Sequence, residues 1–258
     1  MTLATYLINL DRSVSRLEAA TRQLRAAGID FTRVPAFDGR ELDPAQVADY
    51  DHQATMRYVG RPLRGAEIGC YYSHLDCARR FLESGADHAL VLEDDMQLAP
   101  GAMETLAAML RWLAQNRVEW DIINIGAPGL KYTSPLTEIA SHSLVRAHYF
   151  PQTTTGIVWS RSGAQAFVEE HRKISTSVDQ FLREWQTLVD RGLSVTPPLV
   201  SHTGVESDID GGGAGNRRRG GRSLFYGPIK QRRILRNKLR AIRHMLRARR
   251  QAGSSPAR

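Results

Sequence analysis

Ala89-Leu90-Val91-Leu92-Glu93-Asp94-Asp95 is the stretch that decides the fold, because an apolar run passes directly into three adjacent acids. Four apolar residues are too few for a helix, and such a run is typical of a strand buried in a parallel sheet. The strand carries the acids to the carboxyl edge of the sheet, where open α/β folds bind ligands. We therefore expect an α/β fold with its ligand site at this triplet.

Strand and helix patterns alternate on both sides of this stretch. A strand over 4–10, a helix over 13–27 and a strand over 31–34 form a β-α-β unit, which favours a parallel sheet. Residues 1–10 have no basic leader or small-residue cleavage site, so we expect them to form a strand and not a signal peptide. Pro197 and Pro198 favour an edge position for the last strand. The remaining expected elements are strands at 89–92, 120–126, 155–160 and 194–200, helices at 66–84, 101–115, 161–171 and 180–191, and loops at 43–64 and 127–143.

The three acids are costly together unless something neutralises them. Neighbouring carboxylates raise one another's pKa, and solvation is poor at the end of a buried strand. Mg²⁺ or Mn²⁺ would remove this cost, because both ions prefer oxygen ligands and bind diphosphates. Alternate residues of an extended segment point the same way, so Glu93 and Asp95 should share one face and Asp94 the other. The alternative is a solvated turn that caps the next helix.

The net charge of +8 is distributed unevenly over the 258 residues. Residues 1–216 hold 20 Lys and Arg against all 27 Asp and Glu, whereas residues 217–258 hold 15 basic residues and no acid. We expect a mildly acidic domain over 1–210, a Gly- and Arg-rich linker over 211–228 and a basic arm over 229–258.

The arm has the pattern of a basic amphipathic helix. Leu235, Leu239, Ile242 and Leu246 fall on one helical face, and Arg and Lys cover the others. Such a helix favours binding of residues 229–250 to an anionic membrane surface. Nucleic-acid binding is the weaker alternative, since no aromatic residues are interleaved with the basic ones. A helix that simply packs on the domain is another.

Ordered motifs along the chain carry a resemblance to a known family. They are Tyr6-Leu7-Ile8-Asn9-Leu10-Asp11-Arg12 with Arg16, Ala36-Phe37-Asp38-Gly39, Gly65-Ala66-Glu67-Ile68-Gly69-Cys70-Tyr71-Tyr72-Ser73-His74, Leu90-Val91-Leu92-Glu93-Asp94-Asp95, Asp121-Ile122-Ile123-Asn124-Ile125-Gly126, Thr155-Gly156 and Val178-Asp179-Gln180-Phe181-Leu182. Over residues 3–210 the chain resembles the family 25 glycosyltransferases, which include bacterial lipooligosaccharide galactosyltransferases and the collagen galactosyltransferase domain. The resemblance implies a GT-A-like, Rossmann-type mixed and mainly parallel sheet flanked by helices. It also implies a UDP-sugar donor, usually UDP-galactose, and a divalent metal.

The resemblance and the expected sheet edge assign roles to individual residues. The metal ligands are expected to be Glu93, Asp95 and His202. Asp179 is the candidate general base if transfer inverts the sugar configuration, and it only positions substrate if transfer retains it. A helix cap is the structural alternative for Asp179. The donor-binding residues are expected to be Asn9, Leu10, Arg12, Arg16, Ala36, Asp38, Gly39, Glu67, Ser73, His74 and Asp94.

These observations lead to one hypothesis and two alternatives. The hypothesis is a galactosyltransferase of lipopolysaccharide or lipooligosaccharide assembly, whose saccharide acceptor is lipid-linked. Cys70 and Cys77 are two helical turns apart, too far for a disulfide, which favours a cytoplasmic location. The basic arm favours a peripheral position at the inner face of the plasma membrane. The alternatives are a catalytically inactive nucleotide-sugar- or glycan-binding module and a protein that associates with nucleic acid through the arm.

Overall fold

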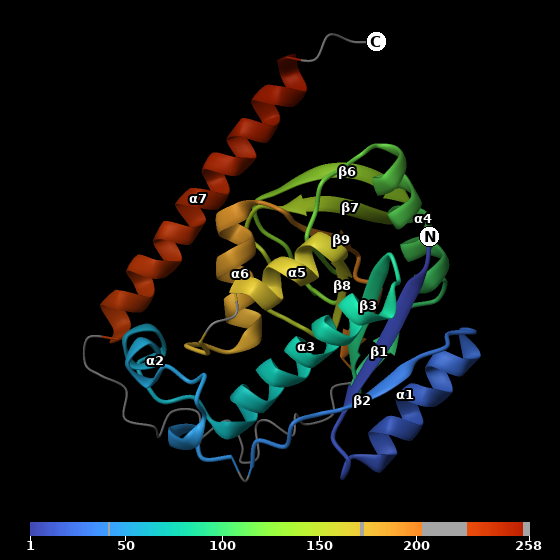
Figure 1. Ribbon diagram of the computed structural model, residues 1–258. Coiled ribbons are helices and arrows are strands. Elements are labelled where there is room, and N and C mark those ends of the chain that lie inside the picture. Colours follow the sequence, from blue (N-terminus) through green and yellow to red (C-terminus); the bar gives the residue numbers. More distant parts are fainter. Residues whose placement is uncertain (41, 171–172, 203–225, 255–258) are drawn as a thin grey trace.

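The apolar run before the acids forms β3 (His88–Glu93), which lies between β1 (Leu3–Asn9) and β8 (Gly156–Ser160) in an eight-stranded sheet (Figure 1). This computed structural model describes residues 1–40, 42–170, 173–202 and 226–254. Strands β8 and β7 run against the other six, so the expected mixed, mainly parallel sheet is confirmed. The sheet is completed by β2 (Thr32–Pro35) beside β1 and, beyond β8, by β5 (Ile122–Asn124), β9 (Gly192–Thr196), β7 (His142–Ala147) and β6 (Thr133–Ile139).

Helices cover both faces of the sheet (Figure 1). Successive strand residues point to opposite faces, so Ala89 and Val91 join the core on one side and Leu90 and Leu92 the core on the other. All four side chains are fully buried, which explains why β3 is apolar without alternation. The first face carries α3 (Gly65–Ser84), α5 (Arg161–Glu170) and α6 (Val178–Val189), and the second carries α1 (Val14–Ala26) and α4 (Ala102–Gln115).

The stretch 43–64, predicted to be a loop, contains the short 3-10 helix η1 (Pro44–Gln46) and α2 (His52–Val59), so that prediction is wrong for α2. Asp51 begins α2 by accepting a hydrogen bond from the Ala54 backbone N–H at 2.8 Å. Gly60 ends the helix in the left-handed conformation that glycine adopts without strain. Both helix signals were present in the sequence.

The predictions were also wrong on the far side of the sheet. The stretch 127–143 was expected to be a loop, but most of it belongs to the β6–β7 hairpin. Its turn holds Ala140 and Ser141, both at positive φ, without the Asn-Gly pair that usually marks such turns. The strand predicted at 194–200 forms β9, which is not at an edge: it lies between β5 and β7, and Pro197 and Pro198 follow it.

A second, two-stranded sheet pairs β4 (Met96–Leu98) with β10 (Val200–His202) in antiparallel register. Neither strand was expected as a separate element. The register sets His202 opposite Met96, the residue after Asp95. The pairing therefore brings His202 to the acidic triplet from a position more than a hundred residues later in the chain.

The predicted arm helix forms α7 (Tyr226–Ser254), which packs on α2, α6 and β6 (Figure 1). Asn237 and Ala241 are its buried positions, whereas Leu235, Leu239 and Leu246 of the predicted apolar face are 58%, 46% and 44% exposed. Among the described residues, no helix combines the length and the apolar character needed to cross a membrane. Most of the expected linker 211–228 and the end of the expected domain lie outside the described residues.

Candidate functional site

A first pocket opens where β1, β2 and β3 end. Cys70 and the exposed Phe37, for which no role was predicted, also lie on its wall. The pocket brings together most of the predicted donor-binding and metal-binding residues, namely Asn9, Leu10, Arg12, Arg16, Ala36, Asp38, Gly39, Ser73, His74, Glu93, Asp94 and Asp95.

Asp94 faces the β1–α1 turn. Its carboxylate accepts a hydrogen bond from Asn9 Nδ2 at 2.7 Å and pairs with Arg16 Nη1 at 3.5 Å. The Asn9 Oδ1 atom in turn accepts from Arg33 Nε at 3.1 Å. Burial raises the pKa of Asp94 above its ordinary value, and the Asn9 hydrogen bond works against that rise. The contacts fix Asn9 and Arg16 on the pocket wall.

Arg12, Asp38 and Arg40 form an ion cluster at the pocket mouth. Arg12 pairs with the Asp38 carboxylate, and Arg40 donates to it from Nη2 at 3.1 Å. The Arg40 hydrogen bonds are the main reason that the pKa of Asp38 falls to about 2. Asp38 therefore stays ionised and holds both guanidinium groups beside the pocket.

The segment after β2 is fixed against α3 by close backbone contacts. Ser73 Oγ accepts from the Phe37 N–H at 3.0 Å and donates to the Gly69 carbonyl at 2.8 Å. A Cβ on Gly39 would lie only 2.0 Å from the Gly65 carbonyl oxygen, so the approach requires glycine. In the structure Ser73 and Gly39 thus shape the pocket, whose wall they also line.

Glu67 does not lie in the first pocket. It accepts two hydrogen bonds from Arg61, both at 2.7 Å, and one from the Arg64 backbone N–H at 2.8 Å. The last contact caps the N-terminus of α3. Glu67 faces a second pocket, and its contacts hold the end of α3 in place.

The second pocket adjoins the first and contains Asp179 and His202. Ser177, not Asp179, occupies the N-cap of α6, and the half-buried Asp179 carboxylate has no hydrogen bond or ion pair to the part of the chain that the structure describes. Glu93 and Cys70 line both pockets and form the wall between them. The other lining residues are Arg61, Arg64, Glu67, Gln152, Thr153, Thr154, Thr155, Ser177 and Val178.

Glu93 points to α3 and the segment before β8. Its Oε1 lies 3.1 Å from His74 Nε2 and accepts from Thr154 Oγ1 at 2.6 Å. Burial favours the neutral acid, but His74 and Thr154 together outweigh it and lower the pKa of Glu93. Glu93 is therefore a carboxylate at neutral pH, and His74, fully buried beside it, is its partner.

Asp95 points the other way along the cleft, toward His202. Its Oδ2 lies 3.5 Å from His202 Nδ1, and the His202 ring also lies 2.8 Å from Thr155 Oγ1. Burial, and then the charge of Glu93, raise the pKa of Asp95. Its other oxygen, Oδ1, is buried and has no hydrogen-bond partner among the residues that the structure describes. A divalent cation beside Asp95 and His202 would satisfy this atom and offset the carboxylate charges, so these residues fit a metal ion.

Sequence reasoning missed several residues of the cleft. Thr154 was not singled out, because its contact with Glu93 depends on β8 running antiparallel beside β3. Arg40 lies in the turn after Asp38 and carries no motif. Cys70 could have been found, since Cys70 and His74 are four residues apart and therefore share one face of a helix.

The family model and the curated relatives that match this chain agree on one family. A family model described as "Glycosyltransferase family 25 (LPS biosynthesis protein)" matches residues 2–182. Procollagen galactosyltransferase 1 of Danio rerio is 31% identical over 69% of this chain and 30% of its own length. Procollagen galactosyltransferase 2 of Homo sapiens is 29% identical over 63% of this chain and 27% of its own length. The chain thus spans less than a third of these curated relatives.

Among solved structures, the chain is similar to the crystal structure of S. aureus TarS 1-349. The two have 11% sequence identity and a TM-score of 0.45 over 79% of this chain and 60% of that one.

Asp38 provides a pH test of the pocket mouth. We expect it to titrate near pH 2 and its pKa to rise toward 3.8 in Arg40→Ala, measured from its side-chain carboxyl carbon by NMR. Because the folded-state pKa is depressed, Asp38 stabilises the fold above about pH 4, and this contribution is lost as the pH falls toward 2. Arg33→Ala, which removes the partner of Asp11, is the control and should leave Asp38 unchanged. An unaltered Asp38 titration in Arg40→Ala would contradict the assignment.

Proposed function

This chain belongs to glycosyltransferase family 25, and we propose that it transfers a hexose, galactose, from a UDP-sugar to a saccharide acceptor. The observation that carries the proposal is the Asp95–His202 pair beside the wall between two pockets, with a buried carboxylate oxygen that no described residue contacts by a hydrogen bond. Two adjoining pockets suit a reaction that joins a donor to an acceptor, because the reacting groups must meet at their boundary.

The first pocket has the chemistry of a nucleotide-diphosphate site. Arg12 and Arg16 border it, and guanidinium groups bind diphosphate oxygens in bidentate pairs. Their present partners, Asp38 and Asp94, would share them with an incoming diphosphate. Phe37 lies on the same wall and offers an aromatic face to a base.

The proposed metal is Mn²⁺ or Mg²⁺, held by Asp95 and His202 with Glu93 as the third ligand expected from the sequence. Such an ion stabilises the negative charge that develops on a leaving diphosphate. The protein's own part is to position the ligands: the β4–β10 pairing fixes His202, and Thr155 orients its ring. His74 and Thr154 keep Glu93 ionised at the boundary.

Asp179 is the proposed base on the acceptor side. Asp179 lies in the first turn of α6, two residues after the N-cap Ser177, so the helix fixes its backbone. The Asp179 carboxylate faces the second pocket. In an inverting reaction it would accept the proton of the acceptor hydroxyl as the new glycosidic bond forms. In a retaining reaction it would position that hydroxyl. Gln152 and Thr153 supply further polar groups for a saccharide.

The acceptor we propose is lipid-linked, in lipopolysaccharide or lipooligosaccharide synthesis, and the enzyme would act at the cytoplasmic face of the membrane. The family description supports this context. The exposed side of α7 supports the location. Arg232, Arg236, Arg243 and Arg247 are exposed there, close along the helix to the exposed leucines. An anionic lipid surface would attract the exposed arginines and bury the exposed leucines.

The metal assignment is tested with Asp95→Asn. In a panel of UDP- and GDP-sugars with and without Mn²⁺, the unaltered chain should bind or hydrolyse a UDP-hexose only with the metal. Asp95→Asn should weaken metal-dependent donor binding at least tenfold without changing the circular dichroism spectrum, because it removes one carboxylate charge but little volume. Asp76→Asn, which breaks a surface ion pair with Arg80, is the matched control. Donor affinity unchanged in Asp95→Asn would refute the metal assignment.

For Asp179→Asn we expect donor binding to persist while transfer falls by a factor of 10² to 10⁴, the usual contribution of a general base. Isothermal titration gives the donor affinity, and NMR of the product gives the rate and the linkage. Glu169→Gln is the matched control, because it makes the same carboxylate-to-amide change at an exposed residue of α5 outside both pockets. Near-normal turnover in Asp179→Asn would exclude it as the base.

The role of α7 is tested by changing Leu235, Leu239 and Leu246 together to Gln. Each fully buried leucine is worth about 1.5–3 kcal/mol, so co-sedimentation with anionic vesicles should weaken at least tenfold. Transfer to a soluble acceptor should be unaltered. Val14→Gln with Leu188→Gln, which also removes exposed apolar side chains, should retain vesicle binding. Equal loss in both variants, or none in either, argues against a specific membrane face on α7.

A further inference from the structure

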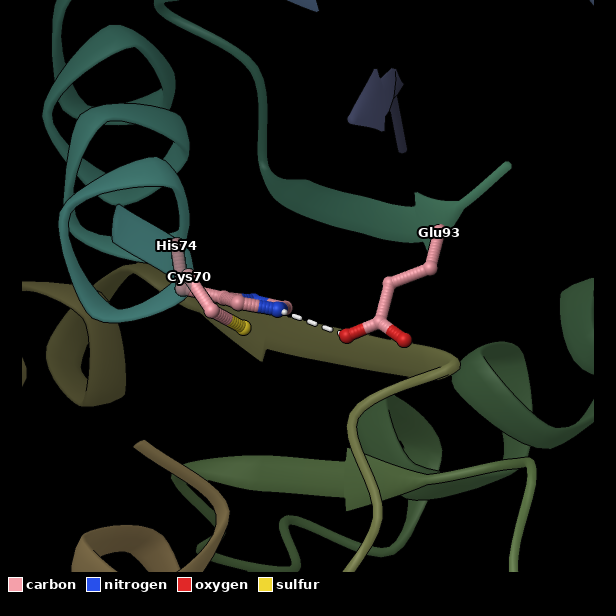
Figure 2. Close-up of side chains that lie close together, drawn as sticks. All are labelled: Cys70, His74 and Glu93. Atoms are coloured by element: carbon pink, nitrogen blue, oxygen red, sulfur yellow. Dashed lines mark hydrogen bonds and ion pairs between the residues drawn. The ribbon is translucent and has the colours of Figure 1, made fainter. Parts of the chain in front are cut away.

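Cys70, His74 and Glu93 form a compact cluster of three different metal-ligating groups (Figure 2). One ligand atom of each lies within 4.8 Å of the others. Figure 2 shows Cys70 and His74 projecting from α3 toward Glu93 at the end of β3. The four-residue spacing on one helix is what places a thiol and an imidazole side by side.

The chemistry of this cluster differs from that of the Asp95–His202 pair. A thiolate is a soft ligand that favours Zn²⁺ over Mg²⁺ or Mn²⁺, and imidazole and carboxylate are also common ligands of zinc. Asp95, by contrast, offers only oxygen. Two cation sites of different preference can therefore stand near each other in the cleft, with Glu93 on the wall between the two pockets.

We propose that Cys70, His74 and Glu93 form a zinc site whose fourth coordination position opens into the cleft. Three protein ligands with one open position are the usual set of an accessible zinc site. Cys70 and Glu93 line both pockets, so an ion can enter from either. The His74 side chain is 1% exposed and its Nε2 lies 3.1 Å from Glu93 Oε1, so the imidazole is held inside the cluster and turned toward the carboxylate.

When Zn²⁺ binds, each of the three side chains exchanges a proton or a hydrogen-bond contact for a bond to the ion. The Cys70 thiol loses its proton to solvent and its sulfur binds Zn²⁺. The contact between the Glu93 carboxylate and His74 Nε2 is broken, the Nε2 proton moves to Nδ1, and the freed Nε2 and carboxylate bind the ion. Zn²⁺ would thereby withdraw Glu93 from the neighbouring metal and inhibit transfer. This last consequence rests on the proposed function, whereas the binding itself does not.

The test uses the full chain, stripped of metal with a chelator and titrated with Zn²⁺ or Co²⁺ in the absence of any donor. Bound Co²⁺ should give a near-ultraviolet charge-transfer band, which requires a thiolate ligand. Cys70→Ser should abolish the band and weaken Zn²⁺ binding at least tenfold, and Glu93→Gln should weaken it as well. Cys77→Ser is the matched control, because Cys77 is buried on the same helix outside the cluster and should leave both readouts unchanged.

The controls separate this inference from the proposed function. Asp95→Asn should retain zinc binding and the cobalt band even though it loses metal-dependent donor binding. If transfer is never observed, the band still tests the site. The inference fails if the unaltered chain gives no band, if the band survives Cys70→Ser, or if Zn²⁺ binding is lost in Asp95→Asn but kept in Cys70→Ser.

Discussion

Three consecutive carboxylates lie at the end of β3, and each contacts a different part of the chain. Glu93 contacts α3 through His74, Asp94 contacts the β1–α1 turn, and Asp95 contacts β10 through His202. Leaving any of them buried and uncompensated would be costly, so the elements around β3 are arranged to supply partners. The same arrangement divides the cleft, because the Glu93 side chain stands between the two pockets.

Much of this could be predicted from the sequence, for a physical reason. The residues before the acids are apolar on both faces of the strand, as expected for a strand that helices cover on both sides. Residues that follow parallel strands lie together at one edge of the sheet. That reasoning places Asn9 and Asp38 beside the triplet. It does not reach Thr154, whose position follows from an antiparallel neighbour. Nor does it reach the Arg40 contact, because Asp38-Gly39 indicates a turn but not the direction of the Arg40 side chain.

The directions in which individual side chains point were the hardest feature to predict from the sequence. Alternation in an extended segment suggested that Glu93 and Asp95 would act together and Asp94 apart. The structure keeps Asp94 apart but turns Glu93 toward His74 and Asp95 toward His202. β3 ends at Glu93, so strand alternation no longer governs the next two residues. Local backbone geometry then decides which partner each acid meets.

Helix α7 reverses the usual arrangement of a surface helix. Beside the buried Ala241, it contacts the domain through polar groups: Asn237 donates to Glu184, Arg233 donates to the Tyr58 carbonyl, and His244 lies 3.5 Å from Asp190. Its leucines face outward. The two hydrophobic cores beside the sheet therefore do not include these leucines. The apolar face of α7 is left available for a partner.

The β4–β10 pairing has a consequence for how the chain can vary. Side chains alternate along a strand, so inserting or deleting one residue in β10 would turn the His202 position to the opposite face while barely changing composition. Surface loops elsewhere tolerate changes of length far more readily. In related sequences, therefore, an alignment gap between Leu199 and His202 would signal an altered cleft even where every acid of the triplet is kept.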